Sequence, residues 1–540
     1  MLYDINQYLT YKSILNKHLK NQVLKKGIKM AKKKKEESKL QFNDFVIFSY
    51  LALMFSVFPL IMHNKYFDIT ITKYNCFVYV SLGLVVFSII SFIIKSVLDE
   101  DNHKSTADKG NRLIKPEFWA LAFAISNVFS CIVSERRMES LTGSEGRYMG
   151  MFSYVLLVTV FFILAKPYRG NNCIFYIFAF STIVMYVIAL AQQSGADIFG
   201  LKEGISKKQY YLFVSTMGNI NIFASFIVIA FAVFAVFFIC SEQIIMKTVS
   251  GIIVCLSAMV CLISNSDSVY LGVGIVVLFL FYIAIYKEKV RWYFLMLLLM
   301  AAGNFTMAFV NKYILVDYYK RDGISRSLEN ITINIVLLVI LALFTIAIWQ
   351  LFKKKPELLK DNKNKLAIGI TVILVVLGVT IVAIAFSNDM SIVNFNYKWG
   401  NYRGFIWSKC IDAYKNFGMV NKIFGYGNET IKLSVSNPNY DEMMEITNRI
   451  YDNAHNEILQ YLLTIGIVGV ISYLGMVVCS ISYMLVKGKN NVYVIVCASA
   501  CIGYFAQSLV NLNQPFTTPF FFVFLALGVG FARGSRLNSN

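Results

Sequence analysis

Long apolar segments constrain this chain more than any other feature of its sequence. Fourteen segments of roughly 20 residues are nearly free of charge, and a helix of that length crosses the hydrocarbon core of a bilayer. Only 15% of the residues are charged, whereas about a quarter are charged in an average soluble domain. The apolar runs are continuous, unlike the alternating strands of an outer-membrane barrel. We therefore predict an all-α polytopic membrane protein.

Basic residues give the predicted orientation of these spans. The spans are residues 44–62, 76–97, 117–133, 148–165, 173–191, 219–240, 247–264, 268–286, 291–310, 331–352, 366–386, 456–486, 491–511 and 517–533. Lysine and arginine gather in nearly all of the connections that an inside amino terminus makes internal. The positive-inside rule therefore predicts a multi-pass protein of the cytoplasmic membrane with both termini in the cytoplasm.

The net charge of +20 could also indicate nucleic-acid binding. Eleven lysines, however, lie within residues 1–40, next to the first span. Lysines at that place hold anionic lipid headgroups. We therefore expect membrane lipids, and no nucleic acid, as partners.

This topology divides the chain into five predicted parts. Residues 1–43 are a basic cytoplasmic tail without the apolar core of a signal peptide, so the first span is expected to direct insertion. Residues 44–386 hold helices 1–11 and residues 387–455 form an extracytoplasmic loop. Helices 12–14 follow in residues 456–533, and residues 534–540 are a second cytoplasmic tail. The large loop is the predicted active site, because it is the longest break between spans and ends on one of only four histidines.

The large loop has its own pattern. Apolar residues at helical spacing predict a short amphipathic helix over 402–414, with Arg403 and Trp407 on one side of it. The run FGYG at 424–427 predicts a tight turn, and the polar run 434–450 predicts a lid. His455 directly precedes the twelfth span.

Each of these polar residues also has a structural interpretation. His455 could be an interfacial histidine that caps a helix, and Arg403 or Arg147 could anchor the chain to lipid phosphate. Asn219 and Asn221 could cap the sixth span rather than bind a sugar. The combination of residues, more than any one of them, favours a functional site.

That combination resembles the O-antigen ligase and polymerase family of membrane glycosyltransferases. The loop carries R-G-x-x-W at 403–407, F-G-x-G at 424–427 and A-H-N-x-x-L-x-x-L-x-x-x-G-x-x-G at 454–469. Outside the loop, GRYMGMFSY at 146–154, MGNINIFASF at 217–226 and AQSLVNLNQPFTTPFFFVFLALG at 506–528 resemble further family segments in the right order. The resemblance implies a GT-C-like fold, with 12 to 14 helices because the family's ligases usually have twelve.

One position departs from the family pattern. The family usually has Ser-Arg-Gly at the outer start of a middle span, and here Asp267 stands at the place of that arginine. If the arginine normally binds donor phosphate, Arg147, Arg321 or Arg326 must supply the charge instead.

The resemblance also implies a reaction. A glycan moves from a polyprenyl-diphosphate donor to a hydroxyl of a glycan, lipid or protein acceptor. Arginine suits the leaving diphosphate, and a neutral histidine near its usual pKa of about 6.5 suits the acceptor proton. His455 is accordingly the expected base and Arg403 the expected diphosphate ligand. Expected further contacts to diphosphate or sugar are Arg147, Trp407, Asn453, Asn456, Asn219, Asn221 and Arg326.

We expect no cofactor and no metal. No aspartate-x-aspartate signature or histidine–carboxylate cluster stands out in the outer loops, and no cysteine pair has metal-ligand spacing. Ligase and polymerase activity in surface polysaccharide biosynthesis are not separated by the sequence. A flippase of the lipid-linked glycan is the alternative from another class, although it would place ionisable residues in the middle of its spans.

Overall fold

The computed structural model describes residues 44–98, 115–168, 173–315, 323–354, 362–365, 367–369, 371–372 and 396–537. Within these residues the fold is helical, apart from a two-residue antiparallel pair in which Phe213 lies opposite Asn219. The predicted span 366–386 falls almost wholly outside the described residues, as do the tail 1–43 and residues 387–395 of the loop. The helical architecture confirms the predicted all-α polytopic fold.

Ten described helices are long and apolar enough to cross a membrane, and three apolar helices are shorter. The first of the shorter helices is Asp44–Leu60. The remaining elements before the large loop are α2 (Ile69–Leu98), α3 (Pro116–Val133), α4 (Arg137–Thr142), α5 (Met151–Leu164), α6 (Cys173–Gln193), η2 (Lys207–Leu212), β1 (Phe213–Val214), η3 (Ser215–Met217), β2 (Gly218–Asn219), α7 (Ile220–Cys240), α8 (Ile244–Ser264), α9 (Asp267–Tyr286), α10 (Val290–Tyr313), α11 (Gly323–Leu328) and α12 (Ile331–Lys354). The loop and the closing helices are α14 (Trp399–Asn416), α15 (Met419–Phe424), η4 (Lys432–Ser436), η5 (Asn437–Asn439), α16 (Tyr440–Thr447), α17 (Glu457–Thr464), α18 (Gly466–Lys487), α19 (Val492–Ser508) and α20 (Thr518–Leu537).

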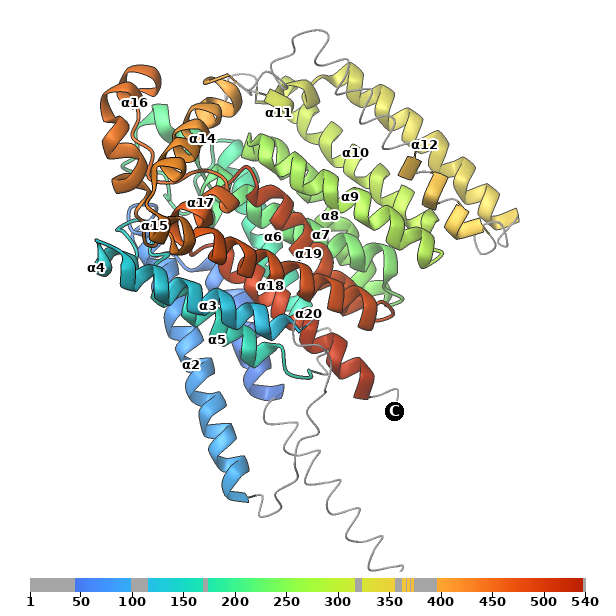
Figure 1. Cartoon of the computed structure of the whole chain (residues 1–540). Coiled ribbons are helices and arrows are strands. Elements are labelled where there is room, and N and C mark those ends of the chain that lie inside the picture. Colours follow the sequence, from blue (N-terminus) through green and yellow to red (C-terminus); the bar gives the residue numbers. More distant parts are fainter. Residues whose placement is uncertain are drawn as a thin grey trace, which may run out of the picture.

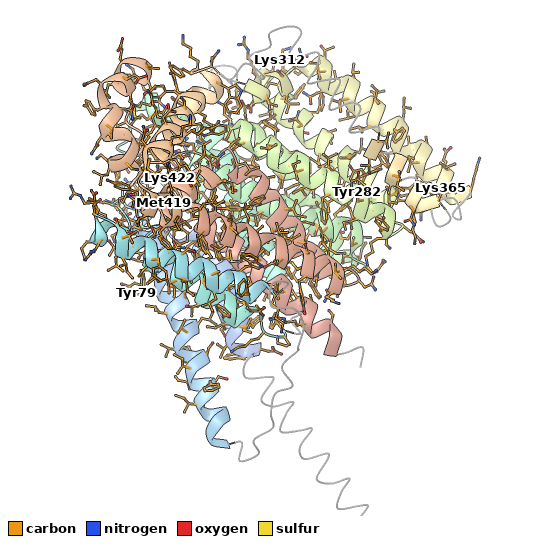
Figure 2. All side chains as sticks on the ribbon, in the orientation of Figure 1. Tyr79, Tyr282, Lys312, Lys365, Met419 and Lys422 are labelled. Carbon is orange, nitrogen blue, oxygen red and sulfur yellow. The ribbon has the colours of Figure 1, made fainter. Side chains whose placement is uncertain are left out.

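Helix α7 forms the centre of the bundle. Its membrane-length window is 100% buried and consists almost entirely of apolar residues, as expected for a helix that is surrounded by others. Helices α2 and α12 are only 17% and 11% buried, and they lie at the flanks of the bundle (Figure 1). Most of their exposed side chains are apolar or aromatic, such as Tyr79 on α2, which is 70% exposed (Figure 2). These flanks therefore suit contact with lipid.

The connections separate into two ends of the bundle. At one end Arg533 donates to the carbonyl of Ala165 at 2.7 Å and pairs with Glu117, and Lys287 Nζ lies 3.5 Å from Asn490 Oδ1. The loop elements α14 and α16, together with α11, lie at the opposite end from the last turn of α20 (Figure 1). The connections that the sequence predicts as basic and inner thus lie away from the predicted active-site loop.

The large loop has an apolar core of its own. Phe405 and Ile406 of α14, Val435 of η4 and Met443 of α16 are all fully buried, and they pack with Leu463 of α17. The predicted amphipathic helix is therefore confirmed. The segment 434–450 that the sequence predicts as a lid is largely helical, and its few apolar residues anchor it in this core. Its role as a lid stays a prediction.

The predicted span 456–486 is two helices, α17 and α18, which meet at Gly466. Gly466 has φ +69°, a left-handed conformation that ends α17 and that glycine adopts at little cost. The FGYG run lies against this break, where the Tyr426 and Gly427 amides donate to the carbonyls of Leu463 at 2.8 Å and Thr464 at 3.0 Å. These bonds satisfy carbonyls at the end of α17 that would otherwise lack partners. The apolar pattern runs through the break, so periodicity alone missed it.

Replacement of Gly466 by alanine should destabilise this junction. A Cβ atom there would overlap the carbonyl of Ile423, and the left-handed φ would strain any side chain. We expect a loss of at least about 2 kcal/mol, seen as a lower midpoint of heat unfolding in detergent. Gly418→Ala is the matched control, because a Cβ atom at Gly418 would meet nothing within 4 Å. Equal midpoints for the two variants would contradict the junction described above.

Candidate active site

Arg403 lies at the first regular turn of α14. The three preceding residues, Gly400 to Tyr402, have left-handed φ values of +57°, +58° and +68°, so the regular helix begins at Arg403. Its Nη1 donates to the carbonyl of Gly400 at 3.3 Å, and its Nε is buried without a hydrogen-bond partner among the described residues. Burial lowers the pKa of Arg403, and the carboxylate of Asp267 partly opposes this effect. Arg403 is therefore a partly buried cation whose Nε is a buried, unused donor.

Trp407 connects α14 to the segment that carries His455. The indole Nε1 donates to the carbonyl of Ala454 at 2.9 Å, which uses the only hydrogen-bonding group of that side chain. The R-G-x-x-W and A-H-N motifs are thus joined by a direct hydrogen bond. This contact gives Trp407 a positioning role, while its predicted contact with substrate stays a prediction.

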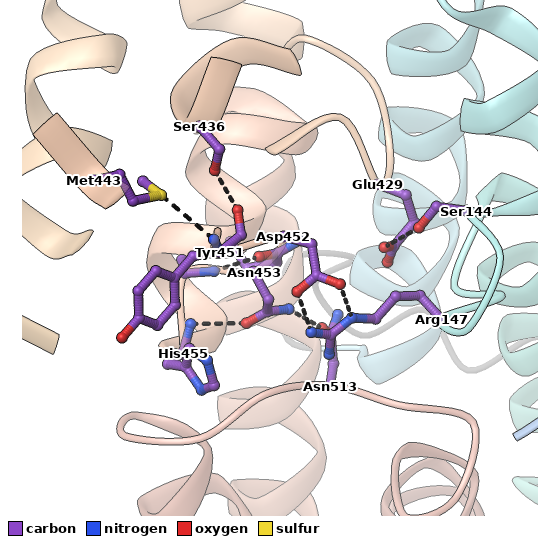
Figure 3. Close-up of polar contacts among 12 residues, drawn as sticks. Ser144, Arg147, Glu429, Ser436, Met443, Tyr451, Asp452, Asn453, His455 and Asn513 are labelled. Carbon is purple, nitrogen blue, oxygen red and sulfur yellow. Dashed lines mark hydrogen bonds and ion pairs between the residues drawn. The ribbon is translucent and has the colours of Figure 1, made fainter. Parts of the chain in front are cut away.

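His455 is held in an uncommon backbone conformation. Its φ is +50°, and its amide donates to Asn453 Oδ1 at 2.7 Å (Figure 3). Asn453 is itself 1% exposed and lies beside Asn513 on the connection between α19 and α20. The next residue, Asn456, caps α17 by accepting from the Leu459 amide at 2.9 Å. Asn453 and Asn456 therefore fix the backbone on both sides of the imidazole, and the helix cap is Asn456 rather than His455.

The surroundings of His455 keep its imidazole neutral. Burial, followed by the positive charges of Arg403 and Arg147, lowers the pKa of His455 from 6.5 to about 3, and Asp452 opposes these effects. The expectation of a pKa near 6.5 is therefore wrong for the ligand-free protein. The sequence shows neither the burial nor that two arginines from distant segments act on one imidazole.

Arg147 comes from the connection between α4 and α5. Its Nε donates to Asp452 Oδ2 at 3.1 Å and its Nη2 pairs with Asp452 Oδ1, a bidentate ion pair between residues 305 positions apart (Figure 3). Burial alone would lower the pKa of Arg147, but Asp452 raises it above its usual value. The remaining nitrogen, Nη1, is buried and has no hydrogen-bond partner within the described part of the chain. Arg147 thus resembles Arg403 in keeping one donor unused.

Two carboxyl groups at this site, Asp452 and Glu429, were not predicted from the sequence. Glu429 follows the FGYG run, is 6% exposed and accepts from Ser144 Oγ at 3.3 Å. Burial raises the pKa of Glu429 to about 7, with Asp452 adding to the shift and Arg147 opposing it. The sequence did offer one indication for Asp452, because this residue stands three positions before His455 in the predicted active-site loop. Nothing in the local sequence indicates that Glu429 is buried.

The other predicted residues have separate positions. Asn219 caps α7 by accepting from the Asn221 amide at 2.8 Å, and Asn221 accepts from Ser266 Oγ at 2.7 Å. The capping interpretation is therefore confirmed for Asn219 but not for Asn221, whose side chain bonds Ser266 instead. Contact of either residue with sugar stays a prediction. Arg326 is exposed on α11, a helix whose second residue, Ile324, donates its amide to Asp267 Oδ1 at 2.9 Å. The charge of Asp267 acts on Arg403, so the acid that stands in place of the family's usual arginine contributes to the electrostatics of the site.

Across the described ranges, no three histidine, cysteine, aspartate or glutamate side chains gather closely enough to hold a metal ion. The expectation of metal independence stays a prediction, because the arrangement of side chains does not test the reaction itself.

The depressed pKa of His455 can be measured. Histidine labelling and NMR should give an imidazole that stays neutral from pH 8 down to about pH 5, since the folded-state pKa is about 3. Arg403→Gln should raise this pKa because it removes a repelling charge, and Asp452→Asn should lower it further. Arg449→Gln, on an exposed residue of the same loop, is the control and should leave the titration unchanged. A wild-type imidazole that titrates near pH 6.5 would contradict the charge arrangement.

Comparison with known proteins agrees with the motifs. No curated protein matches the chain. A family model described as O-antigen ligase matches residues 332–474, a range that contains Arg403, Trp407 and His455 but not Arg147. The family predicted from the motifs is thereby confirmed, and this chain is a membrane protein with an O-antigen ligase domain over residues 332–474.

Proposed function

We propose that this protein transfers a glycan from a polyprenyl-diphosphate donor to an acceptor hydroxyl at the loop end of the helix bundle. One observation carries the proposal: Arg403 and Arg147 each keep one buried donor nitrogen without a partner among the described residues, and the charges of both act on one neutral imidazole. Buried polar groups normally have hydrogen-bond partners. Unused cationic donors of this kind therefore indicate an anionic ligand.

The two arginines suit the leaving group. As the bond between the sugar C1 and the phosphate oxygen breaks, the electron pair moves onto the diphosphate, whose negative charge grows. Fixed cations in a site without bulk water stabilise such developing charge. Arg403 Nε and Arg147 Nη1 are the donors we assign to phosphate oxygens.

His455 is the proposed base for the acceptor hydroxyl. The hydroxyl oxygen bonds to the sugar C1 from the face opposite the leaving diphosphate, and its proton passes to the imidazole, with inversion at C1. With no ligand bound, the pKa of about 3 makes His455 a weak base. A diphosphate bound between the arginines would offset their positive field and raise this pKa. His455 would then become an effective base only when the donor is in place.

Partners and location follow from this reaction. The donor's polyprenyl chain would lie in lipid at the flank of the bundle, and the site would face the outer side of the cytoplasmic membrane. The product would be a surface polysaccharide such as O-antigen, capsule or wall glycan. A ligase would transfer the glycan to a lipid or protein, and a polymerase would transfer it to another carrier-linked glycan.

Substitutions test the assigned roles. Arg403→Gln and Arg147→Gln should each lower the rate of transfer by about 100-fold, because each removes a charged donor to the leaving diphosphate. His455→Ala should lower it by at least as much. Transfer by purified protein is the measurement. Arg449→Gln and Arg137→Gln, on exposed arginines of the same two segments, are the controls and should transfer at the wild-type rate.

Other outcomes of these substitutions would reject the assignment. Full transfer by both His455→Ala and Arg403→Gln would show that the site lies elsewhere. Loss of the passage of lipid-linked glycan across the membrane, with transfer unaffected, would favour a flippase.

The product separates the two forms of the reaction. Purified protein incubated with a polyprenyl-diphosphate glycan should give a ladder of lengths if it is a polymerase, and a single shift of an added acceptor if it is a ligase. We expect the same product and rate after treatment with a metal chelator, since arginines supply the positive charge. Loss of transfer on chelation and its return with a divalent cation would contradict the metal-independent mechanism.

A further inference from the structure

Glu429 is a buried acid that the mechanism above does not use. Its φ of +59° is left-handed and uncommon for a residue with a side chain. The segment is fixed in place by the preceding residue, Asn428, whose amide donates to Ser140 Oγ at 2.9 Å. The carboxyl accepts a hydrogen bond from Ser144, and its charge acts on Arg147, both on the connection between α4 and α5. A strained and anchored backbone thus holds an acid within the electrostatic reach of one of the two proposed phosphate ligands.

The groups facing Glu429 give it only partial compensation for its charge. They are Ser144 and Arg147 from the connection before α5, Tyr154 from α5, and Asp452 from the segment before α17. Asp452 occupies two nitrogens of Arg147, and no ion pair joins Glu429 to a cation in the described ranges. One hydroxyl hydrogen bond is poor compensation for a buried carboxylate, so burial stabilises the protonated form relative to a carboxyl group in water.

We propose that Glu429 takes up a proton when the diphosphate donor binds beside Arg147, so that donor binding and protonation are one coupled step. This inference rests on the proposed function. A diphosphate bound at Arg147 Nη1 would bring negative charge close to Glu429, where an ionised carboxylate would repel it. A proton from water neutralises the carboxylate, and Arg147 then meets the phosphate with only Asp452 as a competing anion.

The direction of the pH effect follows from this coupling. The pKa of Glu429 is about 7 without ligand, so the group is partly ionised at neutral pH. Added negative charge raises the pKa further. Donor affinity is therefore highest below pH 7, where the proton is already present. Above pH 7 the affinity falls by up to about tenfold for each pH unit, because one proton must be bound with each donor.

Calorimetry of the full-length protein in detergent tests this coupling. The probe is a short-chain prenyl-diphospho-monosaccharide, a diester whose phosphates do not titrate between pH 6 and 9. Titrations at pH 8 in two buffers of different ionisation enthalpy give the number of protons taken up. We expect nearly one proton for the wild type. Glu429→Gln, which imitates the neutral acid, should take up none and bind with the same affinity from pH 6 to pH 8.5.

Two further variants make the result decisive. Glu445→Gln, on an exposed acid of α16, should take up the same number of protons as the wild type. His455→Ala should also keep the uptake, which excludes the imidazole as the group that is protonated. Wild-type binding without proton uptake, or uptake retained by Glu429→Gln, would overturn this inference and leave the proposed function intact. Failure of the wild type to bind the probe would reject both.

Discussion

The site depends on one ion pair between segments that lie far apart in the sequence. Arg147 and Asp452 join the connection before α5 to the segment before α17, and Asp452 is three residues from His455. Because Asp452 takes two nitrogens of the guanidinium, the pair fixes both the position of Arg147 and the direction of its remaining donor. Breaking such a pair leaves its buried partner without a compensating charge. The pair therefore holds the imidazole segment to the bundle and orients a cation toward the same space.

A second constraint fixes the loop from the other side. The FGYG run bonds to the last carbonyls of α17, and Trp407 bonds to the carbonyl of Ala454. The loop is thus attached at both ends of α17, while its own small core keeps α14 and α16 together. Residues other than glycine that have a positive φ, including His455 and Glu429, lie near these attachments. Such strain persists only when the surrounding contacts over-determine the backbone, and here they do.

The sequence predicts the apolar helices, which recur along the chain, and the site residues that belong to a motif. Long apolar runs predicted the helices because burial in lipid requires them, and the motifs predicted Arg403 and His455. The break at Gly466 was missed because apolar residues continue on both sides of it. Glu429 and Asp452 were missed because their importance comes from contacts with Arg147, roughly 280 to 300 residues away in the chain. The pKa of His455 was misjudged for the same reason, since local sequence does not show which distant charges meet.

The acid at Asp267 fits this charge arrangement better than the family pattern suggested. Arg147 is partly neutralised by Asp452, and Arg403 is partly neutralised by Asp267. Each cation therefore attracts a resting diphosphate less than an isolated arginine would. In the proposed reaction, the negative charge of the leaving group would grow as the glycosidic bond breaks, and the same two cations would stabilise it more strongly. An interaction that is weak in the ground state and stronger in the transition state raises the rate of the chemical step. In the proposed reaction Arg403 would therefore still favour the transition state over the bound donor, although Asp267 leaves it a weaker positive field than an isolated arginine would supply.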